Sequence, residues 1–65
     1  MKKAIPIDVY DEDGNMLRVE FNDGEGEHII DAIWDESDEQ TSENRTAFRK
    51  WAYNLIEQKG YTLYN

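Results

Sequence analysis

Two short segments near the start of the chain, residues 4–10 and 16–21, alternate between apolar and polar positions. A period of two is typical of a strand that buries one face. The pattern therefore predicts two strands. Their expected core-facing residues are Ile5, Ile7, Val9, Leu17, Val19 and Phe21.

The five residues between these segments predict a tight hairpin. A three-residue loop at 12–14 pairs Val9 with Leu17, so that apolar residues meet across the two strands. A two-residue loop would instead pair Asp8 with Val19, a polar residue with an apolar one. The glycine that ends the longer loop suits the left-handed position after a type I turn. We therefore expect the three-residue loop and its register.

The segment 28–34 fits two structures. As a strand it turns Ile30, Ala32 and Trp34 towards the core, and as a helix it forms one broad apolar stripe. Its β-branched and aromatic content favours the strand. Residues 22–27, which precede it, predict a loop.

One later segment has the period of an amphipathic helix. Gly60 predicts its end, and either Ser37 or Ser42 is expected to cap its start. The apolar stripe, at spacings typical of a helix that packs on a sheet, consists of Phe48, Trp51, Ala52, Leu55 and Ile56.

The predicted elements describe one α+β domain over residues 1–65, a length that leaves no room for a second domain. We expect a small antiparallel sheet, built from a β-hairpin plus one or two further strands, with one amphipathic helix packed on it. The order is strand, strand, a third strand at 28–34, helix, and a short final strand at 61–64.

Acidic residues dominate the charge. The chain has 15 acids and seven bases, giving a formal net charge of −8, and 14 of the acids lie between Asp8 and Glu43. Eight aromatic residues and clear periodicity argue against a disordered chain. The charge opposes direct binding to nucleic acid, whose phosphates attract lysine and arginine.

Catalysis and cofactor binding have little support in the sequence. There is no cysteine and only one histidine, His28, so a nucleophile with an adjacent base is not apparent. Residues 11–15 resemble the start of a calcium loop but lack its later glycine and terminal glutamate. We therefore predict no enzyme activity, no metal and no cofactor.

The acidic stretch has two interpretations. It is either a solvated surface that keeps a small domain in solution, or a surface that imitates the phosphates of DNA and occupies a basic groove. In the second case the partner-binding acids are Asp11, Glu12, Asp13, Asp23, Glu25, Glu27, Asp35, Glu36, Asp38 and Glu39.

An apolar patch is expected on the sheet face that the helix leaves uncovered. If 28–34 is a strand, that patch consists of Tyr10, Met16, Ile29 and Ile33, with charged residues around it. Apolar residues surrounded by charge are typical of a protein interface.

These features predict a small acidic protein-binding module. We expect it to inhibit or modulate a partner with a basic surface, such as a nucleic-acid-binding enzyme, and its size and charge resemble those of phage-encoded inhibitors in composition only. The alternative is a structural or accessory assembly protein that forms a homodimer through the apolar patch. The sequence has no apolar run for a signal peptide or membrane span, so a cytoplasmic location is expected.

Overall fold

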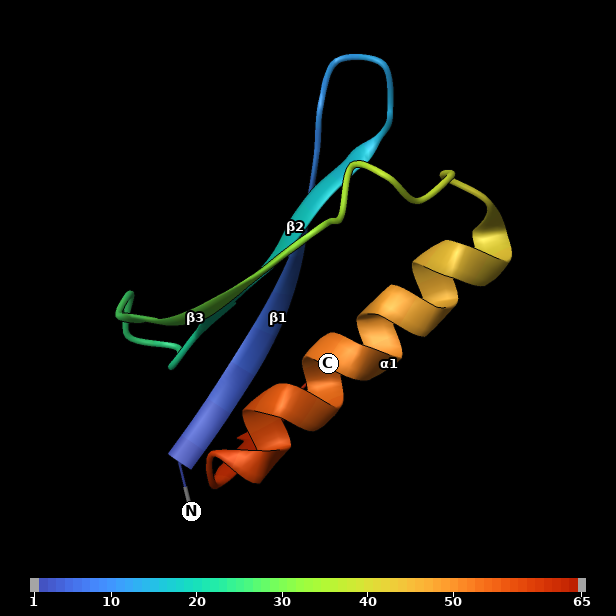
Figure 1. Cartoon of the computed structure of the whole chain (residues 1–65). Coiled ribbons are helices and arrows are strands. Elements are labelled where there is room, and N and C mark those ends of the chain that lie inside the picture. Colours follow the sequence, from blue (N-terminus) through green and yellow to red (C-terminus); the bar gives the residue numbers. More distant parts are fainter. Residues whose placement is uncertain (1, 65) are drawn as a thin grey trace.

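The structure, a computed structural model, describes residues 2–64. It has the expected α+β class, with a four-stranded sheet in the order β3-β2-β1-β4 and one helix on one face (Figure 1). The segment at 28–34 is mainly a strand, as favoured. The elements are β1 (Lys2–Tyr10), β2 (Met16–Asn22), β3 (His28–Ile33), α1 (Ser42–Gln58) and β4 (Tyr61–Leu63).

The sheet is mixed. β1 pairs with β2, and β2 with β3, in antiparallel fashion, but β4 runs parallel to β1. The reason is visible in Figure 1: α1 ends beside the start of β1, so the chain leaving α1 runs alongside β1 in the same direction. The pairing is short and begins with Lys2 opposite Tyr61.

The predicted hairpin loop is confirmed. The Asp11 N–H donates to the Asn15 carbonyl at 2.9 Å, which leaves the three residues 12–14 between them. The Gly14 N–H donates to the Asp11 carbonyl at 3.1 Å, and Gly14 has a φ of 83°. This is the positive φ that the last residue of such a loop requires.

The predicted register beyond the loop is wrong. Tyr10 pairs with Met16, but Val9 pairs with Arg18, so Leu17 lies between the two pairs as an extra residue. Such a β-bulge adds one residue to one strand and displaces every later pair by one. The consequence is that the two strands meet in the register that opposes Asp8 to Val19.

This displacement exchanges the two faces of β1. Ala4 is buried under α1, and Asp8 lies on the same side. Ile5, Ile7 and Val9 lie on the opposite face, where Ile7 is 46% exposed. The prediction that these three residues face the core is therefore wrong.

The core lies between α1 and the sheet. Phe21 and Val19 point into it as predicted, whereas Leu17 is exposed because it belongs to the bulge. Small side chains on both sides allow the helix to approach the sheet closely. The buried cluster consists of Ala4, Val19, Phe21, Ala32, Ala52 and Ile56.

The ends of α1 follow local rules with one change. The N-cap is Thr41, whose hydroxyl accepts from the Asn44 N–H at 3.1 Å, so neither Ser37 nor Ser42 is the cap. Gly60 follows the helix with a φ of 93°, as predicted. Within residues 2–64, no helix has both the length and the apolar character needed to cross a bilayer.

Candidate functional site

The predicted apolar patch is not assembled as expected. Of its four members, Ile33 alone is strongly exposed on the face away from α1, at 71%. Tyr10 lies on the helix side, where its hydroxyl accepts from Arg49, and Met16 is buried. Ile29 is partly buried and packs against the core, since it is the extra residue of a second bulge between β2 and β3.

Other apolar residues occupy the uncovered face. Ile5, Ile7 and Val9 follow one another along it on β1, and Ile33 stands at its far side on β3. This pairing of the strands is the one considered from the sequence as the register of a two-residue loop, which opposes Asp8 to Val19. That register is disfavoured by the pattern alone, because it opposes a polar residue to an apolar one.

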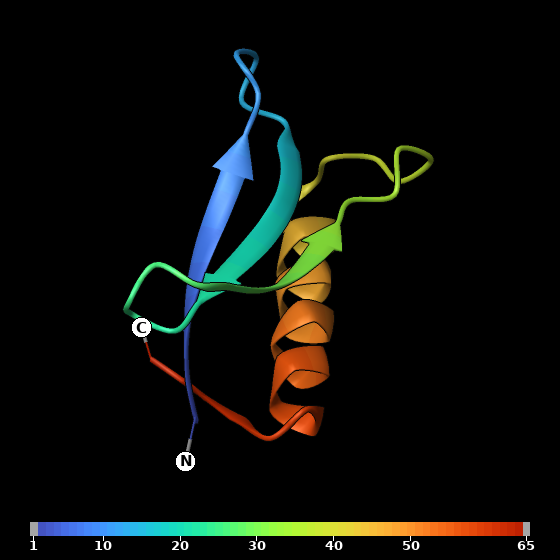
Figure 2. The ribbon, with the colours of Figure 1, turned by 90° about the vertical axis from the view of Figure 1, so that its left-hand side faces the viewer.

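The ten predicted partner-binding acids fall into two groups. The hairpin tip, with Asp11, Glu12 and Asp13, and the connector before α1 lie towards one end of the molecule. The loop at 23–27 lies at the other end of the sheet (Figures 1 and 2). The larger group therefore has seven members, and the acids do not form one continuous row. Its connector members are Asp35, Glu36, Asp38 and Glu39.

Some of these carboxylates hold the loops in place. Asp11 accepts from the backbone N–H groups of Asp13 and Asn15, both at 2.9 Å. Asp35 accepts from the Ser37 N–H at 3.0 Å and from its hydroxyl at 2.8 Å. The hydrogen bond from the Asn15 backbone lowers the pKa of Asp11, and that from the Ser37 backbone lowers the pKa of Asp35. Both groups are therefore charged at neutral pH.

A groove of about 430 Å³ lies between the end of β3 and the first half of α1. Its lining includes Ile33, Phe48 and Trp51, together with Asp35 and Asp38. Apolar walls with a few polar or charged groups are the usual composition of a ligand-binding pocket.

A second groove, of about 490 Å³, lies on the hairpin side of Ile33. Asp11, Leu17 and Glu36 contribute to its lining, while Ile33 and Asp38 line both grooves. Leu17 is exposed here because of the bulge. We call the surface formed by the two grooves together the acidic end. Its acids are Asp11, Asp35, Glu36 and Asp38.

An aromatic row supports the first groove. Trp34 and Phe48 meet edge to face with ring centroids 5.0 Å apart, and Phe48 stacks on Trp51 at 5.8 Å. Trp34 is buried and its Nε1 donates to the Asp38 carbonyl at 3.3 Å, whereas Trp51 is 52% exposed. The prediction that Trp51 packs on the sheet with the rest of the stripe is wrong. It is the site residue that periodicity missed.

The connector that carries the acids is held on both sides. The Gln40 side chain accepts from the Met16 N–H at 3.0 Å and donates to the Met16 carbonyl at 3.1 Å, as an added strand would. On the helix side, Arg45 donates to the Gln40 carbonyl at 2.9 Å, and Asn44 to the Glu39 carbonyl at 2.8 Å. These bonds fix the position of the groove's acidic border.

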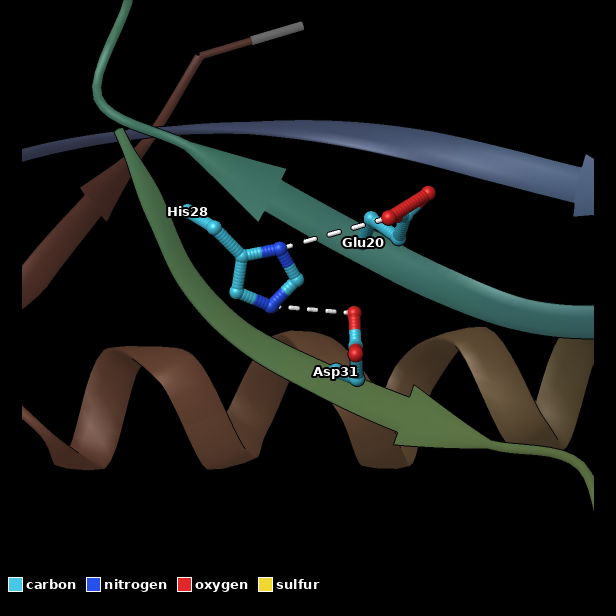
Figure 3. Close-up of side chains that lie close together, drawn as sticks. All are labelled: Glu20, His28 and Asp31. Atoms are coloured by element: carbon cyan, nitrogen blue, oxygen red, sulfur yellow. Dashed lines mark ion pairs between the residues drawn. The ribbon is translucent and has the colours of Figure 1, made fainter. Parts of the chain in front are cut away.

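A separate charged cluster lies on the uncovered sheet face (Figure 3). His28 Nε2 lies 3.0 Å from Asp31 Oδ1, and Nδ1 lies 4.0 Å from Glu20 Oε1. These three residues are near enough to hold a metal ion, but the imidazole turns a different nitrogen to each carboxylate. Arg18, at 3.6 Å from Glu20, already supplies a cation. The arrangement is therefore that of a charge network across two strands.

The described residues bring together no nucleophile with a base and an orienting group, which acyl-transfer chemistry would require. Comparison with protein-family models, with curated proteins and with solved structures finds no match to this chain. The acidic end is accordingly the candidate site on which a function is argued.

Proposed function

We propose that this protein is an acidic protein-binding module whose acidic end binds a partner with a basic surface. One observation carries the proposal: the half-exposed Trp51 lines a groove bordered by Asp35 and Asp38, and Ile33, where β3 ends beside this groove, exposes a second large apolar surface. Leaving such side chains in water is unfavourable, and apolar groups within a charged surround are typical of interfaces.

Charge supports a basic partner. The net charge of −8 attracts positive surfaces, and the four acids of the acidic end, Asp11, Asp35, Glu36 and Asp38, speed their encounter with this site. Contacts to the exposed Trp51 and Ile33 then supply affinity, since aromatic anchors contribute most at protein interfaces.

A nucleic-acid-binding enzyme is the kind of partner that fits this chemistry. Its substrate groove is basic, and the carboxylates of the acidic end would compete there with phosphates. In that case the protein acts as an inhibitor or modulator. The split of the acids into two groups limits the mimicry to the hairpin tip and the connector.

Self-association is the second candidate, and a specific observation favours it. Ile5, Ile7 and Val9 form an apolar line on the sheet face opposite α1. Two copies could bury these lines against each other, although Glu20 and Asp31 on the same face oppose it. Sedimentation at micromolar concentrations separates the two candidates, because a monomer argues against this one.

The test of the proposed function compares two charge-reversed variants. Glu36→Lys with Asp38→Lys alters the acidic end, and Glu25→Lys with Glu27→Lys alters the opposite loop. Each pair brings the formal net charge from −8 to −4, since every substitution adds two positive charges. Within the part of the chain that the structure describes, none of these four carboxylates takes part in a hydrogen bond or ion pair.

Tagged wild-type protein and both variants are used to capture partners from lysate, with and without duplex DNA. We expect the same basic protein with the wild type and with the loop variant, but not with the acidic-end variant. Release by DNA would identify a nucleic-acid-binding partner. Equal capture by both variants, or equal loss, would contradict a role for the acidic end.

A further inference from the structure

β3 is an open edge of the sheet. It is the first strand in the order β3-β2-β1-β4, and among residues 2–64 it pairs with β2 alone. The other edge strand, β4, has three residues, whereas β3 has six. An unpaired strand edge is a template on which another strand can form.

The register shows which backbone groups of β3 are free. The Trp34 N–H donates to the Leu17 carbonyl at 2.9 Å, so these two residues form a hydrogen-bonded pair. Hydrogen-bonded and non-hydrogen-bonded pairs alternate along antiparallel strands. Ala32 therefore turns its backbone groups towards β2, and Asp31 and Ile33 turn theirs outwards. Two N–H groups and two carbonyls are thus presented at the spacing that an added strand requires.

The open edge leads into the first groove of the acidic end, which lies between β3 and α1. Ile33, the last residue of β3, lines this groove together with Phe48 and Trp51. Side chains of an added strand would alternate between the two faces of the sheet. Those on the α1 side would enter the groove beside Trp51, whose half-exposed ring can receive an apolar or a cationic side chain.

The charges around the edge select a basic occupant. Asp35 and Asp38 border the groove, and Asp31 lies on the edge strand itself. β3 contains no lysine or arginine. Two copies joined along β3 would bring these acids together in a complex of two chains that each carry −8, which is unfavourable. A second copy is therefore a poor occupant of this edge.

We infer that β3 binds an extended segment of the partner, rich in lysine or arginine, as an added strand. The Asp31 and Ile33 backbones pair with this segment, its basic side chains meet Asp35 and Asp38, and one side chain enters the groove beside Trp51. The inference rests on the proposed function and specifies how the partner is bound.

Selection from a displayed library of random ten-residue peptides tests the inference, with the whole chain as bait. We expect the selected peptides to alternate lysine or arginine with apolar residues and to lack proline at their centre. With such a peptide bound, amide exchange measured by NMR should slow for Asp31 and Ile33 by at least about tenfold, as for newly hydrogen-bonded groups.

A matched pair of substitutions at one position isolates the backbone contact. Ile33→Ala removes the side chain but keeps the N–H, and Ile33→Pro removes the N–H as well. Proline is tolerated on the free side of an edge strand. We expect Ile33→Pro to bind the peptide about tenfold more weakly than Ile33→Ala. Should the proline variant fail to fold, peptides N-methylated at alternate residues provide the same comparison.

The outcomes separate the two proposals. Basic peptides that bind both Ile33 variants equally and leave exchange at Asp31 unchanged would overturn strand addition but not protein binding. Selection of peptides without basic residues, or of none, would overturn a basic segment as the occupant. If raising the concentration of the protein alone slows exchange at the same amides, the occupant of the β3 edge is a second copy of this chain and not a basic partner. The charge-reversal comparison tests the proposed function independently of all three.

Discussion

Arg49 on α1 donates a hydrogen bond from Nε to Oδ2 of Asp8 on β1 at 2.8 Å. Arg49 Nη2 donates to the Tyr10 hydroxyl at 2.7 Å, and this hydroxyl in turn donates to Asp8 Oδ2 at 3.3 Å. The hydrogen bond to Asp8 raises the pKa of Arg49, and that to Tyr10 adds to the effect. Asp8 thus lies on the helix side of β1, with Arg49 as its partner. The alternating pattern predicted apolar residues of β1 on that side.

Removal of Arg49 alone should destabilise the fold. We expect Arg49→Met to lower the free energy of unfolding by about 1–2 kcal/mol, because it leaves the partly buried Asp8 without its cation. Adding Asp8→Val should recover most of this loss, since neither charge then remains. The measurement is urea denaturation. Arg18→Met, at an exposed ion pair, is the control and should change stability by about 0.5 kcal/mol or less. Equal losses for the two arginines would contradict the prediction.

The exchange of faces on β1 is testable with one type of substitution at two positions. Val19→Thr should cost about 1–3 kcal/mol, because it places a hydroxyl in the core. Ile7→Thr should change the free energy of unfolding by about 0.5 kcal/mol or less, because Ile7 lies on the uncovered face. Thermal denaturation of both variants measures the difference. A cost at Ile7 as large as that at Val19 would instead support the register without a bulge.

The connector should depend on Gln40. We expect Gln40→Ala to reduce stability by about 1–3 kcal/mol, because it leaves both backbone groups of Met16 without their partner. Gln58→Ala, at the exposed end of α1, is the matched control and should be nearly neutral. Chemical denaturation gives the comparison, and amide exchange at Met16 reports the lost hydrogen bond directly. Unchanged exchange at Met16 would show that its N–H does not depend on Gln40.

The hairpin loop should respond to acid. The pKa of Asp11 is lowered below 3.8 in the folded protein, so its carboxylate stabilises the fold above the unfolded pKa. This contribution is lost as the pH falls through the lower, folded pKa. The difference in Tm between the wild type and Asp11→Ala should therefore be constant above about pH 5 and shrink below pH 3.8. Glu12→Ala removes a neighbouring carboxylate and serves as the control for the change in net charge. A difference that grows on acidification would contradict the assignment.

Several features of this protein could be predicted from the sequence because local chemistry determines them. The loop at 12–14 follows from its glycine, and the end of α1 follows from Gly60. In the segment 28–34, Ala32 and Trp34 are buried and Ile30 is partly buried, on the side that the alternation indicates. The concentration of acids in the first two thirds of the chain was also evident, but not their division between two ends of the fold.

The tertiary structure decided the arrangement of the candidate site. An alternating strand has the same pattern whichever face the helix covers, so the faces of β1 depend on the bulge at Leu17. That bulge is accommodated by distant groups, since Trp34 pairs with Leu17 and the side chain of Gln40 pairs with Met16. The polar residue that the pattern excluded from the helix side, Asp8, is accepted there because Arg49, 41 residues later, neutralises it. Alternation records only that a residue is polar; whether its partner is water or a cation on another element is determined when the chain folds.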